Sequence, residues 1–205
     1  MTQRILVWDV PTRVFHWLQA LSFGVAYLTA YSERMRNYHV ALGYILLGLL
    51  VFRLLWGFIG TRYARFRSFL FYPGQTFSYL RAMLKGGSAH YPGHNPAGSV
   101  SVWLLLLGLF VCVTGVLALQ DDAGDRVVDM HGMATNVMLG VIALHLVGVL
   151  MSSLLHRENL VRAMLTGYKP AHAEEGIRHA YHWLGVLMVA AVIIFWFAYV
   201  KRPLG

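Results

Sequence analysis

The stretch from Met130 to Leu155 reads MHGMATNVMLGVIALHLVGVLMSSLL. It contains no Asp, Glu, Lys or Arg, and it is longer than the about 20 apolar residues that cross a bilayer as a helix. Two histidines, His131 and His145, lie fourteen residues apart within it. In a helix this spacing places the two imidazoles roughly 21 Å apart and within about 40° of the same face. Polar groups inside a membrane are costly and usually functional, so the pair predicts ligands at two depths.

The amino-acid composition indicates whether this chain folds in water or in a membrane. Of its 205 residues, 58% are hydrophobic and only 13% are charged, whereas about a quarter of the residues in soluble proteins are charged. The sequence therefore predicts an integral membrane protein. Segment Met1–Arg13 carries charges and lacks a small-residue cleavage site, so we expect no removable signal peptide. Cys112 is the only cysteine, which excludes an internal disulfide and a C-x-x-C-H site for covalent haem.

Apolar runs predict five transmembrane helices, and the fold class expected is an all-α integral membrane protein. The five spans cover Val14–Ser32, His39–Gly60, Ala97–Gln120, Met130–Leu155 and Ala180–Val200. The longest connection, Thr61–Pro96, holds a predicted interfacial helix at Gln75–Leu84.

Lysine and arginine predict the orientation of these spans. With the N-terminus inside, most Lys and Arg residues fall in inside segments, so the positive-inside rule favours a cytoplasmic N-terminus and a periplasmic C-terminus. The outside segments keep only Arg34, Arg36, Arg126, Lys201 and Arg202. The formal charge of +8 is then explained by topology and by contact with anionic membrane lipid, and it does not indicate nucleic-acid binding.

In this topology the expected depths of the histidines in the membrane place them in two pairs. His39 and His131 both begin a span at the outer face, whereas His16 and His145 lie toward the inner face. We therefore expect His39 and His131 to ligate an outer haem, and His16 and His145 an inner one. A neutral imidazole on each side closes the coordination of the iron, which suits electron transfer. The alternative is that these are core histidines with ordinary hydrogen bonds.

Arg53 is the one fully charged residue in the middle of a predicted span. It lies fourteen residues inward from His39, and no span contains Asp or Glu, so a propionate of the inner haem is its predicted partner. Arg13 is a second candidate for the inner haem, and Arg34 and Arg36 are candidates for the outer one. The alternative is an arginine whose long side chain reaches the inner interface.

Several motifs accompany the histidines. The sequence reads VWDVPTRVFHW at residues 7–17, RLLWG at 53–57 and GHNP at 93–96, with His39 and the His131/His145 pair between and after them. This pattern resembles the prokaryotic cytochrome b561 family, and within it the b-type cytochrome subunits of nickel-iron hydrogenases. The resemblance covers about residues 5–155.

The resemblance implies a diheme four-helix bundle over residues 1–155, followed by a cytoplasmic linker and an additional fifth helix over 156–205. It implies two noncovalent haem b groups, with His16, His39, His131 and His145 at the ligand positions. It also implies a subunit of the respiratory chain in the bacterial cytoplasmic membrane. Electrons would pass between a periplasmic redox protein, a hydrogenase or a cytochrome, and the membrane quinone pool.

Two further groups of residues are candidates for quinone chemistry. Asn95, beside Gly93 and His94 at the inner entrance of the third span, is suited to donating a hydrogen bond to a quinone carbonyl. The alternative for this group is a turn with an Asn-Pro helix start. His182 and His179 precede or begin the last span and are candidates for a proton relay, with an aromatic membrane-interface belt as the alternative.

Three functions remain open at this point. The first is an electron-transfer subunit, and the second is a free-standing superoxide:quinone oxidoreductase. The third is a histidine-lined metal transporter, which leaves the matched depths of the histidines unexplained. The predicted outer loop at residues 121–129 reads DDAGDRVVD. An acidic loop favours a basic protein partner over the superoxide anion, because an anionic substrate is steered by positive charge.

Overall fold

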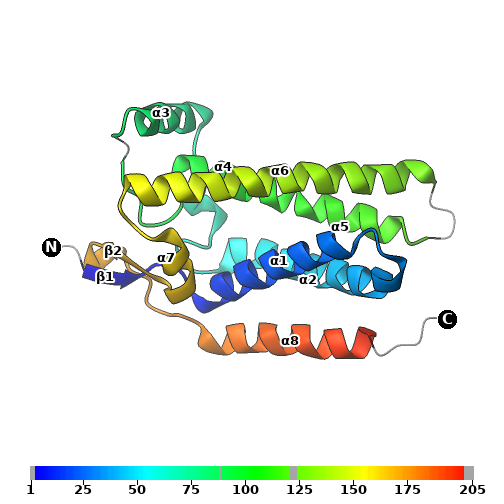
Figure 1. Cartoon of the computed structure of the whole chain (residues 1–205). Helices are drawn as coiled ribbons and strands as arrows, with labels where there is room; N and C mark the ends of the chain where they lie inside the picture. The colour runs from blue at the N-terminus through cyan, green and yellow to red at the C-terminus, as the bar shows by residue number, and fades with distance from the viewer. Residues whose placement is uncertain (1–2, 88, 121–123, 201–205) are drawn as a thin grey trace. The chain divides into compact units, whose positions relative to one another are not determined.

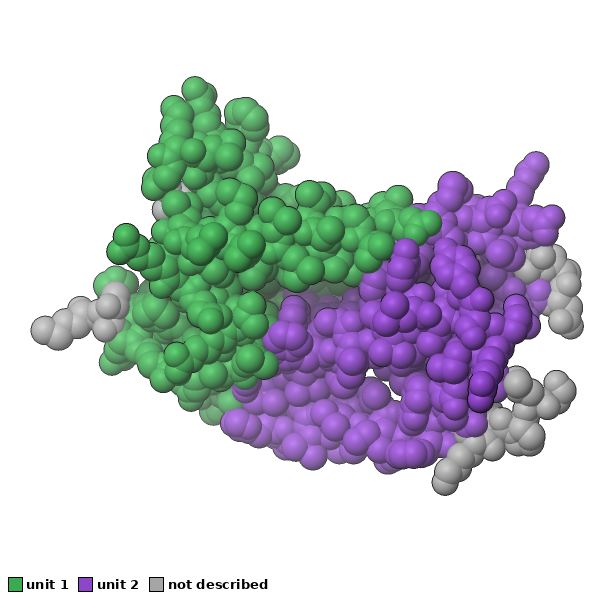
Figure 2. Space-filling model, in the orientation of Figure 1, with its two compact units in different colours: residues 1–9, 55–107, 136–180 green, residues 10–54, 108–135, 181–205 purple. Residues whose placement is uncertain are grey.

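The computed structural model describes residues 3–87, 89–120 and 124–200. The chain forms two compact units, coloured separately in Figure 2. Unit 1 comprises residues 1–9, 55–107 and 136–180, and unit 2 comprises residues 10–54, 108–135 and 181–205. Two helices, Arg36–Ile59 and Asp125–Leu155, continue from one unit into the other.

The elements are labelled in Figure 1. The α-helices are α1 (Val10–Thr29), α2 (Arg36–Ile59), α3 (Pro73–Leu84), α4 (Pro96–Leu106), α5 (Gly108–Leu117), α6 (Asp125–Leu155), α7 (Leu160–Thr166) and α8 (His182–Val200). The strands are β1 (Gln3–Leu6) and β2 (Tyr168–Ala171), and short 3-10 helices cover Glu33–Met35, Phe66–Phe69 and Ala173–Glu175. The predicted interfacial helix at Gln75–Leu84 corresponds to α3.

Four helical segments are long and apolar enough to cross a membrane: Glu33–Ile59, Pro96–Leu117, Asp125–Leu155 and His182–Val200. The chain is therefore a mostly helical, multi-pass membrane protein. The predicted first span forms α1, but Arg13, His16 and Gln19 lower its hydropathy, and α1 is not among the four. The C-terminal helix expected at Ala180–Val200 forms as α8.

Unit 1 corrects the expectation of an all-α chain. Strands β1 and β2 pair antiparallel, with Gln3 opposite Ala171 and Leu6 opposite Tyr168. An apolar cluster in this unit joins Ile5 of β1 and Ala171 of β2 to Val7, Trp8 and Tyr63. Because the sheet has two short strands of four residues each, its pattern in the sequence is too brief to be distinguished from a loop. The segment expected as a linker after α6 is therefore folded, as α7, β2 and a 3-10 turn.

The predicted third span is not one uninterrupted helix. α4 ends at Leu106, and the N–H of Leu107 donates to the carbonyl of Leu104 at 3.0 Å. This tighter, 3-10-type bond closes the last turn of α4 before α5 begins at Gly108. At the other end of α4, Asn95 is the N-cap and Pro96 occupies the first turn.

In unit 2, α8 packs against α1 and α2. Gly185 is buried on α8, and a Cβ added there would come within 2.5 Å of Val10 Cγ1. Trp196 of α8 stacks on Tyr38 of α2 with ring centroids 5.7 Å apart. The helix is thus joined to the rest of the unit by a close backbone approach at one end and by aromatic rings at the other.

We expect Gly185→Leu to displace α8. The added side chain has no space beside Val10, and overpacking of this kind costs roughly 1–3 kcal/mol. A decrease of a few degrees in the melting temperature, with faster proteolysis between α7 and α8, would be the expected result. Gly24→Leu is the matched control, since nothing lies within 4 Å of a Cβ at Gly24. Equal stability of the two variants would contradict the packing described for Gly185.

Candidate functional site

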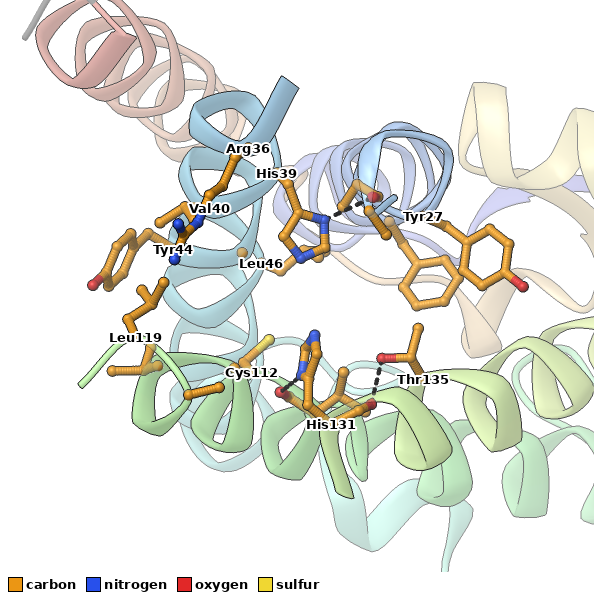
Figure 3. Close-up of a pocket in the computed structure, with 18 of the residues that line it drawn as sticks. Tyr27, Arg36, His39, Val40, Tyr44, Leu46, Cys112, Leu119, His131 and Thr135 are labelled. Atoms are coloured by element: carbon orange, nitrogen blue, oxygen red, sulfur yellow. Dashed lines mark hydrogen bonds between the residues drawn. The ribbon is translucent and has the colours of Figure 1, made fainter. Parts of the chain in front are cut away.

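His39 and His131 face each other inside unit 2 (Figure 3). His39 lies near the start of α2 and His131 lies in the second turn of α6. Their ring centroids are 6.1 Å apart, and the ring planes are nearly perpendicular at 88°. The predicted outer pair of histidines is therefore brought together, by two helices that are far apart in the sequence.

A backbone carbonyl holds each imidazole. Nδ1 of His39 donates to the carbonyl of Ala26 at 2.8 Å, and Nδ1 of His131 donates to the carbonyl of Val111 at 3.0 Å. A carbonyl can only accept, so the proton lies on Nδ1 and the lone pair lies on Nε2. In Figure 3 the second ring nitrogen of each histidine points toward the other ring. Such outer hydrogen bonds fix the tautomer and the orientation of histidines that bind metals.

The separation of the rings fits one metal ion between them. An imidazole nitrogen binds a metal at about 2.0–2.1 Å, so two rings on opposite sides of one ion have centroids about 6 Å apart. Among the described residues, no group of three or more His, Cys, Asp or Glu is arranged to hold a metal. Two protein ligands in line leave the remaining positions to a planar macrocycle that brings its own donors. The donor set therefore fits haem, and haem b in particular because C-x-x-C-H is absent from the sequence.

A cavity of about 220 Å³ surrounds the histidine pair. Its lining is mostly apolar and comes from α1, α2, α5, α6 and the turn before α2; it includes Phe23, Tyr27, Tyr44, Leu46, Val111, Val116 and Leu119. Charged side chains in the lining are Glu33 and Arg36. Gly43, one turn after His39, also lines the cavity, and a Cβ there would meet nothing within 4 Å. An apolar slot with a cation among its lining residues suits a flat macrocycle that carries carboxylates.

Gly115 on α5 sets the position of His131. A Cβ at Gly115 would lie 2.9 Å from Cε1 and 3.2 Å from Nδ1 of His131. Glycine thus allows the ring to lie close to α5 while its Nδ1 donates to the carbonyl of Val111. The sequence contains no signal for this role, because glycine is common in membrane helices.

We expect Gly115→Val to move His131 out of line with His39. The branched side chain would occupy the space of the ring, so the variant should retain less haem at this position and show an altered low-spin absorption spectrum. Gly24→Val is the matched control, because Gly24 is exposed, is not among the residues that line the cavity, and a Cβ there meets nothing within 4 Å. Haem content of Gly115→Val equal to that of the wild type would show that the ring is free to shift.

The two histidines of the predicted inner pair belong to different units. His16, in unit 2, is half-buried on α1, and its ring packs edge to face on Trp17 at 5.0 Å. His145, in unit 1, is half-buried on α6. Their ligation of a common haem stays a prediction.

The four predicted propionate partners differ in burial. Arg53 is buried in α2, with 4% of its surface exposed. Arg13 is half-buried on α1, and Arg34 and Arg36 are exposed. Of these four, Arg36 is the one that lines the cavity around His39 and His131.

The predicted quinone residues lie in unit 1 and have defined contacts. Asn95 Oδ1 accepts from the N–H of Gly98 at 2.7 Å, which is the helix cap weighed as the alternative, and its Nδ2 donates to Ser152 Oγ at 3.4 Å. His94 packs between Trp8 and Phe69, with centroid distances of 4.8 and 4.6 Å. A Cβ at Gly93 would come within 2.5 Å of the Tyr63 ring. The cap and the contacts of the glycine explain part of this motif structurally.

The remaining candidates are at the surface or outside the described residues. His179 and His182 are both exposed, and their role as a proton relay stays a prediction. Asp121 and Asp122 of the predicted acidic loop lie outside the described residues. The sequence does not predict that the carbonyls of Ala26 and Val111 hold the two imidazoles, because a residue of any type has a backbone carbonyl.

Comparison with known proteins gives the family. A family model described as prokaryotic cytochrome b561 matches residues 7–167. The chain belongs to the prokaryotic cytochrome b561 family. This membership, together with the apolar helices, identifies a membrane b-type cytochrome that functions in electron transfer, and it implies haem b as the cofactor.

Similar curated proteins are cytochrome subunits. Probable Ni/Fe-hydrogenase B-type cytochrome subunits of Rhizobium leguminosarum bv. viciae and Azotobacter vinelandii are each 23% identical to this chain. Each match covers 80% of this chain and 88% of the relative. A protein of the same description from Bradyrhizobium diazoefficiens is 21% identical, with 80% of this chain and 85% of the relative covered. No solved structure gives a significant match.

Proposed function

We propose that this cytochrome b561 carries electrons across the bacterial cytoplasmic membrane, between a periplasmic redox partner and the quinone pool. The observation that supports the proposal most directly is the His39/His131 pair, with each Nδ1 tied to a carbonyl and each Nε2 directed at the other ring. Haem b, when bound, supplies a one-electron carrier. His39 and His131 would hold this haem together, and a haem held by two imidazoles is suited to electron transfer rather than to binding an external ligand.

A second haem b is part of the proposal. His16 and His145 are its proposed ligands, and the side chains of Arg53 and Arg13 would compensate its propionates. A guanidinium is suited to this task because it remains charged when buried and can form two parallel hydrogen bonds to a carboxylate. Arg36, which lines the cavity in unit 2, and Arg34 would serve the outer haem in the same way.

Asn95 is the proposed contact of the quinone. Its Oδ1 is used by the helix cap, so the amide N–H groups are the donors that face the rest of unit 1. The bond from Nδ2 to Ser152 Oγ is long, at 3.4 Å. A quinone carbonyl would replace this weak bond by a stronger one. Gly93 and His94 would shape the same region.

The partner proposed at the outer face is a redox protein. The similar proteins are described as hydrogenase subunits, so a hydrogenase is one candidate and a periplasmic cytochrome is the other. The proposed topology has the N-terminus in the cytoplasm and the C-terminus in the periplasm. Anionic lipid would contact the basic inner segments.

Electron transfer by the purified, haem-loaded chain in lipid vesicles tests this function. We expect the chemically reduced chain to be reoxidised by a short-chain quinone, and to be reduced again by the periplasmic partner protein. Superoxide-driven quinone reduction by the chain alone would instead support a free-standing oxidoreductase. If no quinone reoxidised the reduced chain, the proposed function would be contradicted.

A further inference from the structure

Unit 1 contains a buried ion pair at the end of α6. Lys169 Nζ on β2 lies 3.3 Å from Glu158 Oε2, in the turn between α6 and α7. His90, in the loop before α4, donates from Nε2 to the same oxygen at 3.1 Å. Lys169 also donates to the carbonyl of Tyr91 at 3.2 Å. One carboxylate oxygen is thus shared by two cationic or protonatable groups.

The cluster continues into the unit through aromatic groups. The rings of His90 and His156 have centroids 5.6 Å apart, which is within the reach of one bridging water between their nitrogens. Nε2 of His156 shares a hydrogen bond of 3.4 Å with the hydroxyl of Tyr79 on α3. His156 directly follows α6, and its backbone N–H donates to the carbonyl of Ser152 at 3.0 Å, so the two residues lie one turn apart. Ser152 is in turn the partner of Asn95.

The exposure of the side chains decreases from His90 to the other groups of this series. The side chain of His90 is 41% exposed, whereas the side chains of Glu158 and Lys169 are 9% and 4% exposed. Tyr79 is 5% exposed. The series therefore starts in water and ends among buried groups.

Glu158 has an unused acceptor. Its Oε2 holds both ion-pair partners, but its Oε1 is buried and accepts no hydrogen bond from the described residues. A buried acceptor without a donor is costly and requires an explanation. A proton or a water molecule passing through this position would satisfy it.

We propose that His90, Glu158 and His156, with Lys169 and Tyr79 as positioning residues, form a proton path from the aqueous surface toward Asn95 and Ser152. The inference rests on the proposed quinone site, for which it supplies the proton source. Reduction of one quinone to its quinol takes two electrons, which arrive one at a time from haem b, and two protons. The two protons come from water through His90 and bind to the two quinone oxygens. Quinol oxidation would release both by the reverse path.

The charges of the cluster suit this role. Burial lowers the pKa of Lys169 below its ordinary value, although Glu158 opposes this effect. Burial also lowers the pKa of His156, with His90 acting in the same direction and Glu158 opposing. A neutral His156 can accept a proton from the His90 side and pass it on.

Glu158→Gln tests the path, because glutamine keeps the size of the side chain but cannot carry the proton. We expect the haem content and the absorption spectrum to be unchanged. Reoxidation of the pre-reduced full chain by a short-chain quinone should slow by at least about tenfold. The reoxidation rate of the variant should decrease further as the pH rises, and its solvent deuterium isotope effect should be larger than that of the wild type. Glu174→Gln is the matched control, because Glu174 is an exposed carboxylate in the same unit, and it should match the wild type.

His90→Gln is the second variant, in case Glu158→Gln fails to fold. His90 is exposed, so its replacement should leave the fold intact while slowing the same step. If the wild type reacts with quinone and both folded variants keep its rate, pH profile and isotope effect, the proton path is wrong and the proposed function stands. If the wild type does not react with any quinone, the proposed function fails and this inference fails with it.

Discussion

Replacing His39 or His131 with alanine is expected to remove one haem from the purified chain. In the proposed site each imidazole would supply one of the two protein ligands of the haem, and its Nδ1 bond to Ala26 or Val111 holds the ring in place. Without either ring, the cavity would lose one of the two nitrogen donors proposed to hold the haem. Haem per protein should fall to about half of the wild-type value, and the remaining spectrum should be that of the inner haem alone. The pyridine haemochrome assay and reduced-minus-oxidised spectra measure both quantities.

His172→Ala is the control for this experiment. His172 is an exposed histidine of unit 1, so its loss should change neither haem. Alanine at His16 or His145 should remove the other haem, which would complete the proposed pairing. An unchanged spectrum after replacement of His39 would show that the imidazole pair in unit 2 does not ligate haem.

Arg53→Gln is expected to lower the potential of the inner haem. The Arg53 side chain is buried, and in a low-dielectric site a nearby cation disfavours the oxidised haem, which has one more positive charge than the reduced form. Removing the cation should therefore stabilise the oxidised form and lower the potential, by an amount on the order of 60 mV, which is a tenfold change in the one-electron equilibrium. A redox titration monitored in the visible range measures the shift.

Arg53→Lys provides the graded comparison. Lysine keeps the charge but loses the planar pair of donors, so an intermediate shift is expected. The outer haem should hardly respond to either variant. A titration in which Arg53→Gln shifts neither potential, or only the outer one, would show that Arg53 does not pair with an inner propionate.

The helices and the proximity of His39 to His131 could be predicted from the sequence, because hydropathy and residue spacing indicate both. Long apolar runs without charge determine where α2, α6 and α8 form. Within such runs a histidine is conspicuous, and matched depth was enough to pair His39 with His131. The structure confirms that these two rings lie together. Their common binding of haem is the step that the ligand variants test.

Other features depend on contacts between residues far apart in the sequence, which no local sequence pattern indicates. The pairing of β1 with β2 joins residues that are more than 160 positions apart, and each strand is too short to be recognised alone. The role of Gly115 appears only once α5 lies against His131. The cluster of His90, Glu158 and Lys169 likewise joins a loop, a turn and a strand.

The most direct test of the account is the number of haem b groups in the purified full-length chain. Haem should be measured by pyridine haemochrome and protein by amino-acid analysis, with low-spin signals counted by electron paramagnetic resonance. We expect two haem b groups per chain, each low-spin and each with two imidazole ligands. A ratio of one, or a high-spin iron in the fully loaded protein, would contradict it.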